Sequence, residues 1–190
     1  VFGLTAILIV PFVRVYTLGI HDANYIQPLF AALIVAANAG HCLRLPYNII
    51  ILAAGHYKQT QNNYIIAAIL NIVVSVVTVK AWGLIGVAIG TLVAMGYQTV
   101  WMAVYDSRNL IKWPLRKFAK QIFVDGLTVI IGFFATRMIV MPEATYIEWV
   151  FLAIKTAIIW IVIVGVLNMV FYRDKMQSMI HKICAKVKRG

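Results

Sequence analysis

Residues 146–171 read YIEWVFLAIKTAIIWIVIVGVLNMVF, an apolar run whose charged residues are Glu148 and Lys155. A helix needs roughly 20 residues to cross about 30 Å of hydrocarbon. The run meets that length, and it shows no alternation of polar and apolar residues that would predict a strand. It therefore predicts a helix that crosses a membrane.

The composition of the whole chain agrees with that expectation. Of 190 residues, 63% are hydrophobic and 12% are charged, whereas soluble domains are about 45–50% apolar and about 25% charged. A water-soluble domain of this length cannot bury so much apolar surface, so lipid is the expected solvent. A soluble enzyme, a disordered tail and a disulfide-stapled secreted module are thereby excluded. The predicted fold class is all-α, a polytopic bundle of membrane helices.

Six runs are long enough to predict transmembrane helices, at about residues 1–18, 27–54, 63–79, 83–105, 121–141 and 146–171. The predicted organisation is four helices in 1–105, a basic cytoplasmic link at 106–120, two terminal helices in 121–171, and a basic tail at 172–190. Apolar residues recur in the tail at three- and four-residue steps, which predicts an amphipathic helix on the membrane surface. A second surface segment is expected around Trp113. Because the sequence begins inside an apolar run, we expect it to be part of a longer chain.

The lysines and arginines predict the orientation of these helices. If six helices alternate, most of the cations outside the spans fall on one side: Lys58, Arg108, Lys112, Arg116, Lys117, Lys120, Arg173, Lys175, Lys182, Lys186, Lys188 and Arg189. The opposite side has Lys80, Arg137 and Arg14. An excess of Lys and Arg marks the cytoplasmic side of a membrane protein. The C-terminus is therefore predicted to be cytoplasmic, and the charge is not taken to indicate nucleic-acid binding.

Polar residues inside the second predicted helix form a stripe. At about 100° per residue, Asn38, His41, Arg44 and Asn48 fall within an arc of roughly 120°, while Pro46 points elsewhere. A central arginine in a bilayer costs about 2.5–3.5 kcal/mol even on a lenient scale, so this face should border protein or a water-filled cavity. Arg44 is the leading candidate for binding an anionic headgroup, because a guanidinium pairs with phosphate through two hydrogen bonds. The alternative is a polar cluster that only locks the helices together.

Other polar residues in the predicted spans extend the candidate site. Asn71 lies on one face of the third helix, where hydrogen-bonded packing is the alternative. Lys155 lies near the middle of the last helix, where a lysine that snorkels or pairs with Glu148 is the alternative. Small residues at three- and four-residue spacing, Gly83, Gly86, Gly90 and Ala94, predict a close helix–helix contact.

Several kinds of chemistry have no motif in this sequence. There is no phosphate-binding loop of the GxxxxGK[ST] type, no HExxH, no CxxC pair and no nucleophile elbow. The two cysteines, Cys42 and Cys184, match no metal spacing. We therefore expect a protein that is not an enzyme and holds no cofactor or metal.

Four stretches together resemble the C-terminal lobe of bacterial polysaccharide flippases, the Wzx-type exporters of the multidrug/oligosaccharidyl-lipid/polysaccharide superfamily. They are RLPYN at 44–48, LAAGHYKQT at 52–60, ILN at 69–71 and GLIGVAIGTL at 83–92. Such proteins have twelve to fourteen helices in two lobes, so the resemblance implies that this chain holds the last six and lacks an N-terminal lobe.

The resemblance also implies a substrate and a mechanism. Such flippases move a polyprenyl-diphosphate-linked oligosaccharide across the bacterial plasma membrane by alternating access, driven by an ion gradient or the membrane potential. The positions that match the family motifs are Arg44, Asn48, Asn71 and the loop residue Lys58. His41, Asn38 and Lys155 join the expected headgroup site from the residue pattern alone.

Three other functions remain open from the sequence. A drug or metabolite antiporter of the same superfamily would carry an acidic residue deep in the N-terminal lobe. A peptidoglycan-precursor flippase is close to the main interpretation. A non-transport protein belongs to a different class: a membrane-embedded glycan-assembly enzyme would show clustered carboxylates or histidines at a membrane surface, and a structural subunit would bury the polar stripe between helices.

Overall fold

The computed structural model describes residues 1–111, 115–139 and 141–173, which form helices joined by turns and loops, with no strand in those ranges. The helices are α1 (Phe2–Tyr16), α2 (Pro28–Ala53), α3 (Tyr57–Trp82), α4 (Leu84–Asn109), α5 (Leu115–Thr136) and α6 (Tyr146–Phe171). They divide into two compact units, residues 1–120 and 121–190, and each is described separately below. The expected surface segment at Trp113 and the expected tail helix at 174–190 lie outside the described residues.

Five of the six helices, α2 to α6, are long and apolar enough to cross a membrane. Their outward faces carry large apolar side chains, as in α3, where Ile72 and Val77 are 63% and 67% exposed. In water such surfaces would be costly to expose. The chain is therefore a multi-pass helical membrane protein. The 15 residues of α1 reach only about 22 Å at the helical rise, which is shorter than the span expected there.

The structure corrects four of the expected helix boundaries. α3 begins at Tyr57, so most of the expected link before residue 63 is helical. α4 continues to Asn109 and α5 begins at Leu115, which reduces the expected link at 106–120 to a few residues. α5 also ends at Thr136, before the expected limit at 141. The added turns of α3, α4 and α5 contain polar residues, so a hydropathy pattern does not detect them. A helix can continue beyond the hydrocarbon region of the membrane.

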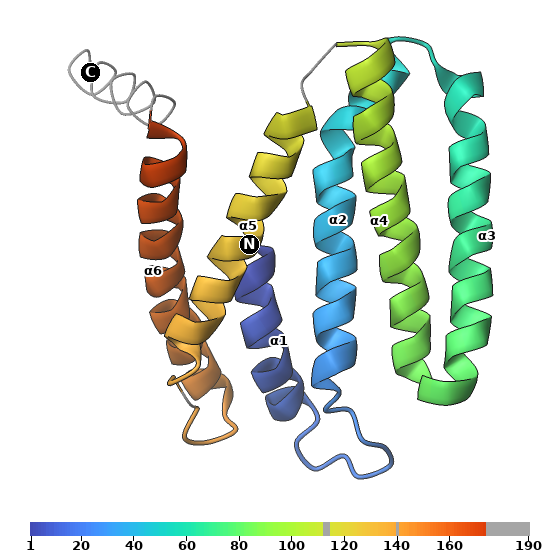
Figure 1. The fold of residues 1–190 in the computed structure, drawn as a ribbon. Helices are drawn as coiled ribbons and strands as arrows, with labels where there is room; N and C mark the ends of the chain where they lie inside the picture. Colours follow the sequence, from blue (N-terminus) through green and yellow to red (C-terminus); the bar gives the residue numbers. More distant parts are fainter. Residues whose placement is uncertain (112–114, 140, 174–190) are drawn as a thin grey trace. The chain divides into compact units, whose positions relative to one another are not determined.

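In the first unit, α4 lies between α2 and α3 and packs on both, and α1 packs on α2 (Figure 1). α2 and α4 run in the same direction, and α3 runs opposite to both. The turn from α3 to α4 is made by Gly83 at φ 54°, a backbone conformation that glycine adopts without steric cost. A one-residue turn keeps α3 and α4 side by side along their whole length.

The contact between α3 and α4 is close because small residues line it. A Cβ added to Gly86 would stand 2.5 Å from the carbonyl carbon of Thr78, and one added to Gly90 would meet the Ser75 hydroxyl and stand 2.9 Å from the Asn71 carbonyl oxygen. The Thr78 hydroxyl donates to the Gly86 carbonyl at 2.8 Å. The close contact that the glycine spacing predicts is confirmed.

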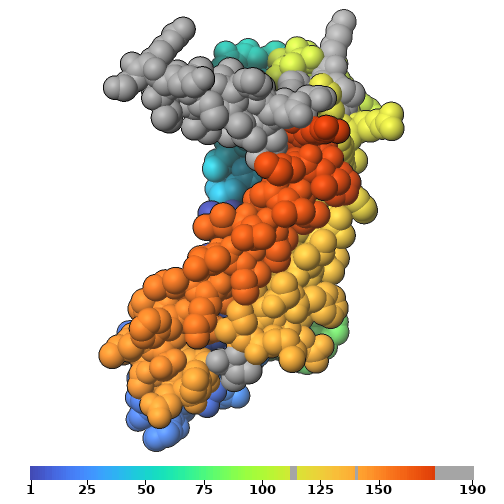
Figure 2. All heavy atoms as spheres, turned by 90° about the vertical axis from the view of Figure 1, so that its left-hand side faces the viewer, coloured from blue at the N-terminus to red at the C-terminus, as the bar shows by residue number. Residues whose placement is uncertain are grey.

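In the second unit, α5 packs on α6 through another glycine. A Cβ on Gly132 would collide with the indole of Trp160, and the rings of Phe123 and Phe171 meet edge to face at 6.5 Å. α6 begins after Thr145, whose hydroxyl accepts the backbone N–H of Glu148 at 3.4 Å. α6 is drawn in orange and red in Figure 2. Large apolar side chains along its length, such as Ile147, Ile161 and Val170, are exposed, as a lipid-facing helix requires.

Candidate functional site

Arg44 lies on the face of α2 that packs against α4. Ala37 and Ile51, at seven-residue spacing on either side of it, are buried on the same face. Between Ala37 and Arg44, the carbonyl of Gly40 accepts a hydrogen bond from the Thr99 hydroxyl of α4 at 2.9 Å. Arg44 itself is only 7% exposed. The cation of the stripe therefore lies in a helix interface and not on a lipid-facing surface.

The guanidinium of Arg44 is bonded to a neutral neighbour. Its Nη2 donates to Nδ1 of His41 at 2.7 Å. A ring nitrogen accepts a hydrogen bond only when it carries no proton, so this contact requires a neutral imidazole with its proton on Nε2. The Nε of Arg44 is buried without a partner, and no ion pair joins Arg44 to any carboxylate in the part of the chain that the structure describes.

The other members of the stripe do not converge on Arg44. Asn38 is exposed, and its Nδ2 donates to the Ile34 carbonyl of its own helix at 2.8 Å. Asn48 is half-buried, and its Oδ1 accepts the Tyr64 hydroxyl of α3 at 2.7 Å. The stripe is thus one buried cation with His41 beside it, one inter-helix hydrogen bond and one outward-facing amide.

The bond between Asn48 and Tyr64 predicts a small coupling in stability. A double-mutant cycle with Asn48→Ala and Tyr64→Phe should give a coupling free energy of about 0.6 kcal/mol, the average for such bonds in membrane proteins. Unfolding in mixed micelles measures it. The matched cycle of Asn38→Ala with Tyr64→Phe joins residues that share no bond and should be additive. Additivity in both cycles would contradict the contact.

Asn71 lies in the α3–α4 contact and not at an open surface. Its Oδ1 accepts the Ser75 hydroxyl at 3.1 Å, and its backbone carbonyl faces Gly90. The surroundings of Asn71 are those of a packing residue. The two expected lysines are both exposed: Lys58 in the first turn of α3, and Lys155 on α6 in the second unit.

The sequence pattern did not single out two buried polar residues, because it placed Asn63 at the very start of a span and Asp106 in a link. Asn63 of α3 is 1% exposed and Asp106 of α4 is 2% exposed. Both polar atoms of each side chain lack a hydrogen-bond partner among the described residues. A signal for Asp106 was present: it follows Thr99 by seven residues, so it extends the face of α4 that packs on α2.

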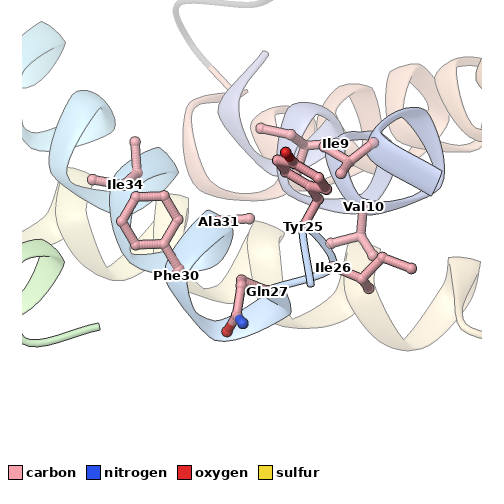
Figure 3. Close-up of a pocket in the computed structure, with 9 residues that line it drawn as sticks. Ile9, Val10, Tyr25, Ile26, Gln27, Phe30, Ala31 and Ile34 are labelled. Carbon is pink, nitrogen blue, oxygen red and sulfur yellow. The ribbon is translucent and has the colours of Figure 1, made fainter. Parts of the chain in front are cut away.

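An apolar cavity of about 170 Å³ lies where α1, the loop before α2 and the first turns of α2 meet (Figure 3). Ile9 and Val10 of α1 line one side, Phe30 and Ile34 of α2 line the other, and the ring of Tyr25 lies between them. The Tyr25 hydroxyl is bonded to Asp22 at 3.0 Å. The lining suits hydrocarbon, and Arg44 is not part of it.

The described residues contain no group of three or more His, Cys, Asp or Glu that could hold a metal ion. Comparison with protein-family models, with curated proteins and with solved structures gives no match for this chain. The fold and the site therefore define a class, a multi-pass helical membrane protein with a buried cation in one of its membrane helices.

Proposed function

We propose that the chain is the C-terminal lobe of a flippase that moves polyprenyl-diphosphate-linked oligosaccharide across the bacterial plasma membrane. The motif resemblance in residues 44–92 supplies the substrate class. The site supplies a buried guanidinium, and a diphosphate is the anion that a guanidinium binds best through paired hydrogen bonds. Movement would follow alternating access between this lobe and an N-terminal lobe.

One observation carries the proposal: Arg44 is buried in a membrane helix and has no carboxylate partner among the described residues. A buried charge is normally paired, because an unpaired one is expensive. A neutral His41 offsets little of that cost. A phosphate group that arrives from outside the chain would supply the missing charge, and the exposed face at Asn38 gives polar surface next to it.

In this proposal the basic residues of the α3 start and of 108–120 face the cytoplasm, where the glycolipid is assembled. His41 then orients the guanidinium, and Asn48 and Tyr64 hold α2 against α3. Asn71 and Lys155 have weaker support, since Asn71 is engaged in packing and Lys155 lies in the second unit.

The burial of Arg44 in the α2–α4 interface favours a second candidate role, in which the polar cluster only stabilises helix packing. In that case the guanidinium fixes helix register and meets no substrate. The drug antiporter, the peptidoglycan-precursor flippase and the glycan-assembly protein predict the same interface, so they are separated from the main proposal by substrate tests alone.

Accessibility of single cysteines distinguishes a water-filled cavity from a dry interface. With Cys42 and Cys184 replaced by alanine, the scan introduces cysteine in place of Asn38, Arg44 or Asn48, and a membrane-impermeant charged thiol reagent is applied. Ile72→Cys on the lipid-facing side of α3 and Lys58→Cys at the exposed start of α3 are the controls.

The proposal expects the cysteine at position 44 to react at least roughly tenfold faster than the one at position 72, because reaction needs a hydrated thiolate. Glycolipid added to the vesicles should slow the reaction of the cysteine at position 48, in a variant that keeps Arg44. A reactive cysteine at position 58 together with inert ones at 44 and 48, in every condition, would establish the structural function instead.

A further inference from the structure

Among the described residues, the carboxyl of Asp106 is a buried ionisable group that has no role in the proposed function. It is 2% exposed, and neither oxygen accepts a hydrogen bond or lies in an ion pair among the described residues. An ionised carboxylate in such a place is costly unless it is paired. The arrangement is therefore the one expected when Asp106 carries a proton.

The register of α2 on α4 places Asp106 near Arg44. The bond between the Gly40 carbonyl and the Thr99 hydroxyl sets these two residues at the same level. Because the helices run in the same direction (Figure 1), Arg44 is level with Ala103, and Asp106 lies three residues further on, about 4.5 Å along the axis. Packed helices are about 8–10 Å apart, a separation that an arginine side chain bridges when it turns toward Asp106.

The charged and titratable groups around Asp106 come from every neighbouring element. From α2 they are Arg44 and Tyr47, and the Tyr47 phenol interacts electrostatically with the Asp106 carboxyl. From α3, His56 binds the Tyr105 hydroxyl at 2.9 Å. Arg108 follows Asp106 by two residues on α4. The start of α5 touches Tyr47 through Phe118, and it carries the exposed cations Arg116, Lys117 and Lys120.

We propose that Asp106 is a proton-binding site that competes with phosphate for Arg44. With the proton lost, the carboxylate takes the guanidinium of Arg44 away from His41. With the proton bound, Arg44 is released to bind the diphosphate of the substrate. The proton comes from and returns to water at the end of α4, and no covalent bond changes. This inference rests on the proposed function, and it assigns the ion that the transport cycle would use.

Two measurements on the intact protein in proteoliposomes test the inference. The first is the infrared band of protonated carboxyl groups, recorded against pH for the wild type and for Asp106→Asn. The second is the affinity for inorganic pyrophosphate against pH, for the same pair. Asp125→Asn, an exposed aspartate of α5, is the matched control in both.

The expected results are a carboxyl band that Asp106→Asn removes and Asp125→Asn keeps, and a pyrophosphate affinity that differs between the wild type and Asp106→Asn. At high pH the wild type should bind roughly tenfold more weakly than Asp106→Asn, within the usual range of coupling between two sites. At low pH the two should bind alike. Protonation of pyrophosphate itself affects both measurements equally, so it cancels in the ratio of the two affinities.

The outcomes separate the two proposals. If pyrophosphate binds through Arg44 and the wild-type to Asp106→Asn ratio stays constant with pH, the proton site is wrong and the flippase proposal stands. If the carboxyl band titrates but pyrophosphate does not bind, the headgroup site is wrong. A band that is unchanged in Asp106→Asn also overturns the proton site.

Discussion

Replacing Arg44 by methionine should reduce glycan export at least tenfold while the protein still inserts and folds. Methionine keeps the length of the side chain and removes its charge, and well-packed apolar replacements of buried charges are often neutral for stability or stabilising. The lost interaction is a charge-assisted contact of about 1.5–3 kcal/mol, and about 1.4 kcal/mol corresponds to a factor of ten. Surface-glycan display in cells that lack their own copy measures the effect.

Two further variants make that result specific. Arg44→Lys keeps the charge but loses the paired donors, so it should restore part of the export. Lys80→Ala removes a cation that is exposed in the last turn of α3, and it should leave display within about twofold of the wild type, as expected for an exposed charge. Normal export by Arg44→Met, at normal protein level, would exclude Arg44 as the headgroup contact.

Replacing Gly90 by leucine should destabilise the first unit by about 3 kcal/mol or more. The new side chain would meet the Ser75 hydroxyl and the backbone of Asn71 and Ser75. Backbone cannot yield as a flexible side chain does, so α3 and α4 must separate, and forcing extra atoms into a packed contact typically costs 1–3 kcal/mol and sometimes more. Denaturation in mixed micelles, followed by fluorescence, measures the free energy of unfolding.

The same helix offers a matched control in Gly96. A Cβ at Gly96 meets nothing within 4 Å, so Gly96→Leu makes the same chemical change in the same helix without a collision. Its free energy of unfolding should change by less than about 1 kcal/mol, within the gain in helix propensity that glycine replacement brings. Equal effects at both positions would show that the α3–α4 contact is looser than described.

Much of the fold follows from the sequence because lipid leaves few choices. The bounds of α6 are those expected, since its apolar run is long and Thr145 caps its start. The bounds of α3 and α4 differ from expectation at their polar ends, because Tyr57–Asn63 and Asp106 are compatible with a helix in water. Hydropathy detects the part of a helix that lies in hydrocarbon and not its last turns.

The candidate site could be predicted only in part. Angular spacing along one helix places His41 beside Arg44, and the bond between them is present. The surroundings of the polar stripe depend on how α4 packs against α2. The bond between Gly40 and Thr99 fixes that register, and the sequence of α2 alone does not contain it. The burial of Asp106 near Arg44 could be predicted only with the correct end of α4 and the correct register of α4 on α2. The sequence pattern supplied neither.

The two helices that pack on α4 differ in stiffness, because α2 contains a proline, Pro46, in its interior. Proline has no amide hydrogen, so the carbonyl of Cys42 lacks its usual donor four residues later. α2 therefore lacks one backbone hydrogen bond around Arg44, and we expect it to bend more easily there than an uninterrupted helix. The close glycine contact holds α3 and α4 together, so these two helices should move as one rigid body. A bend of α2 relative to α3 and α4 would occur close to Arg44. Even a small bend there would change the direction in which the guanidinium points.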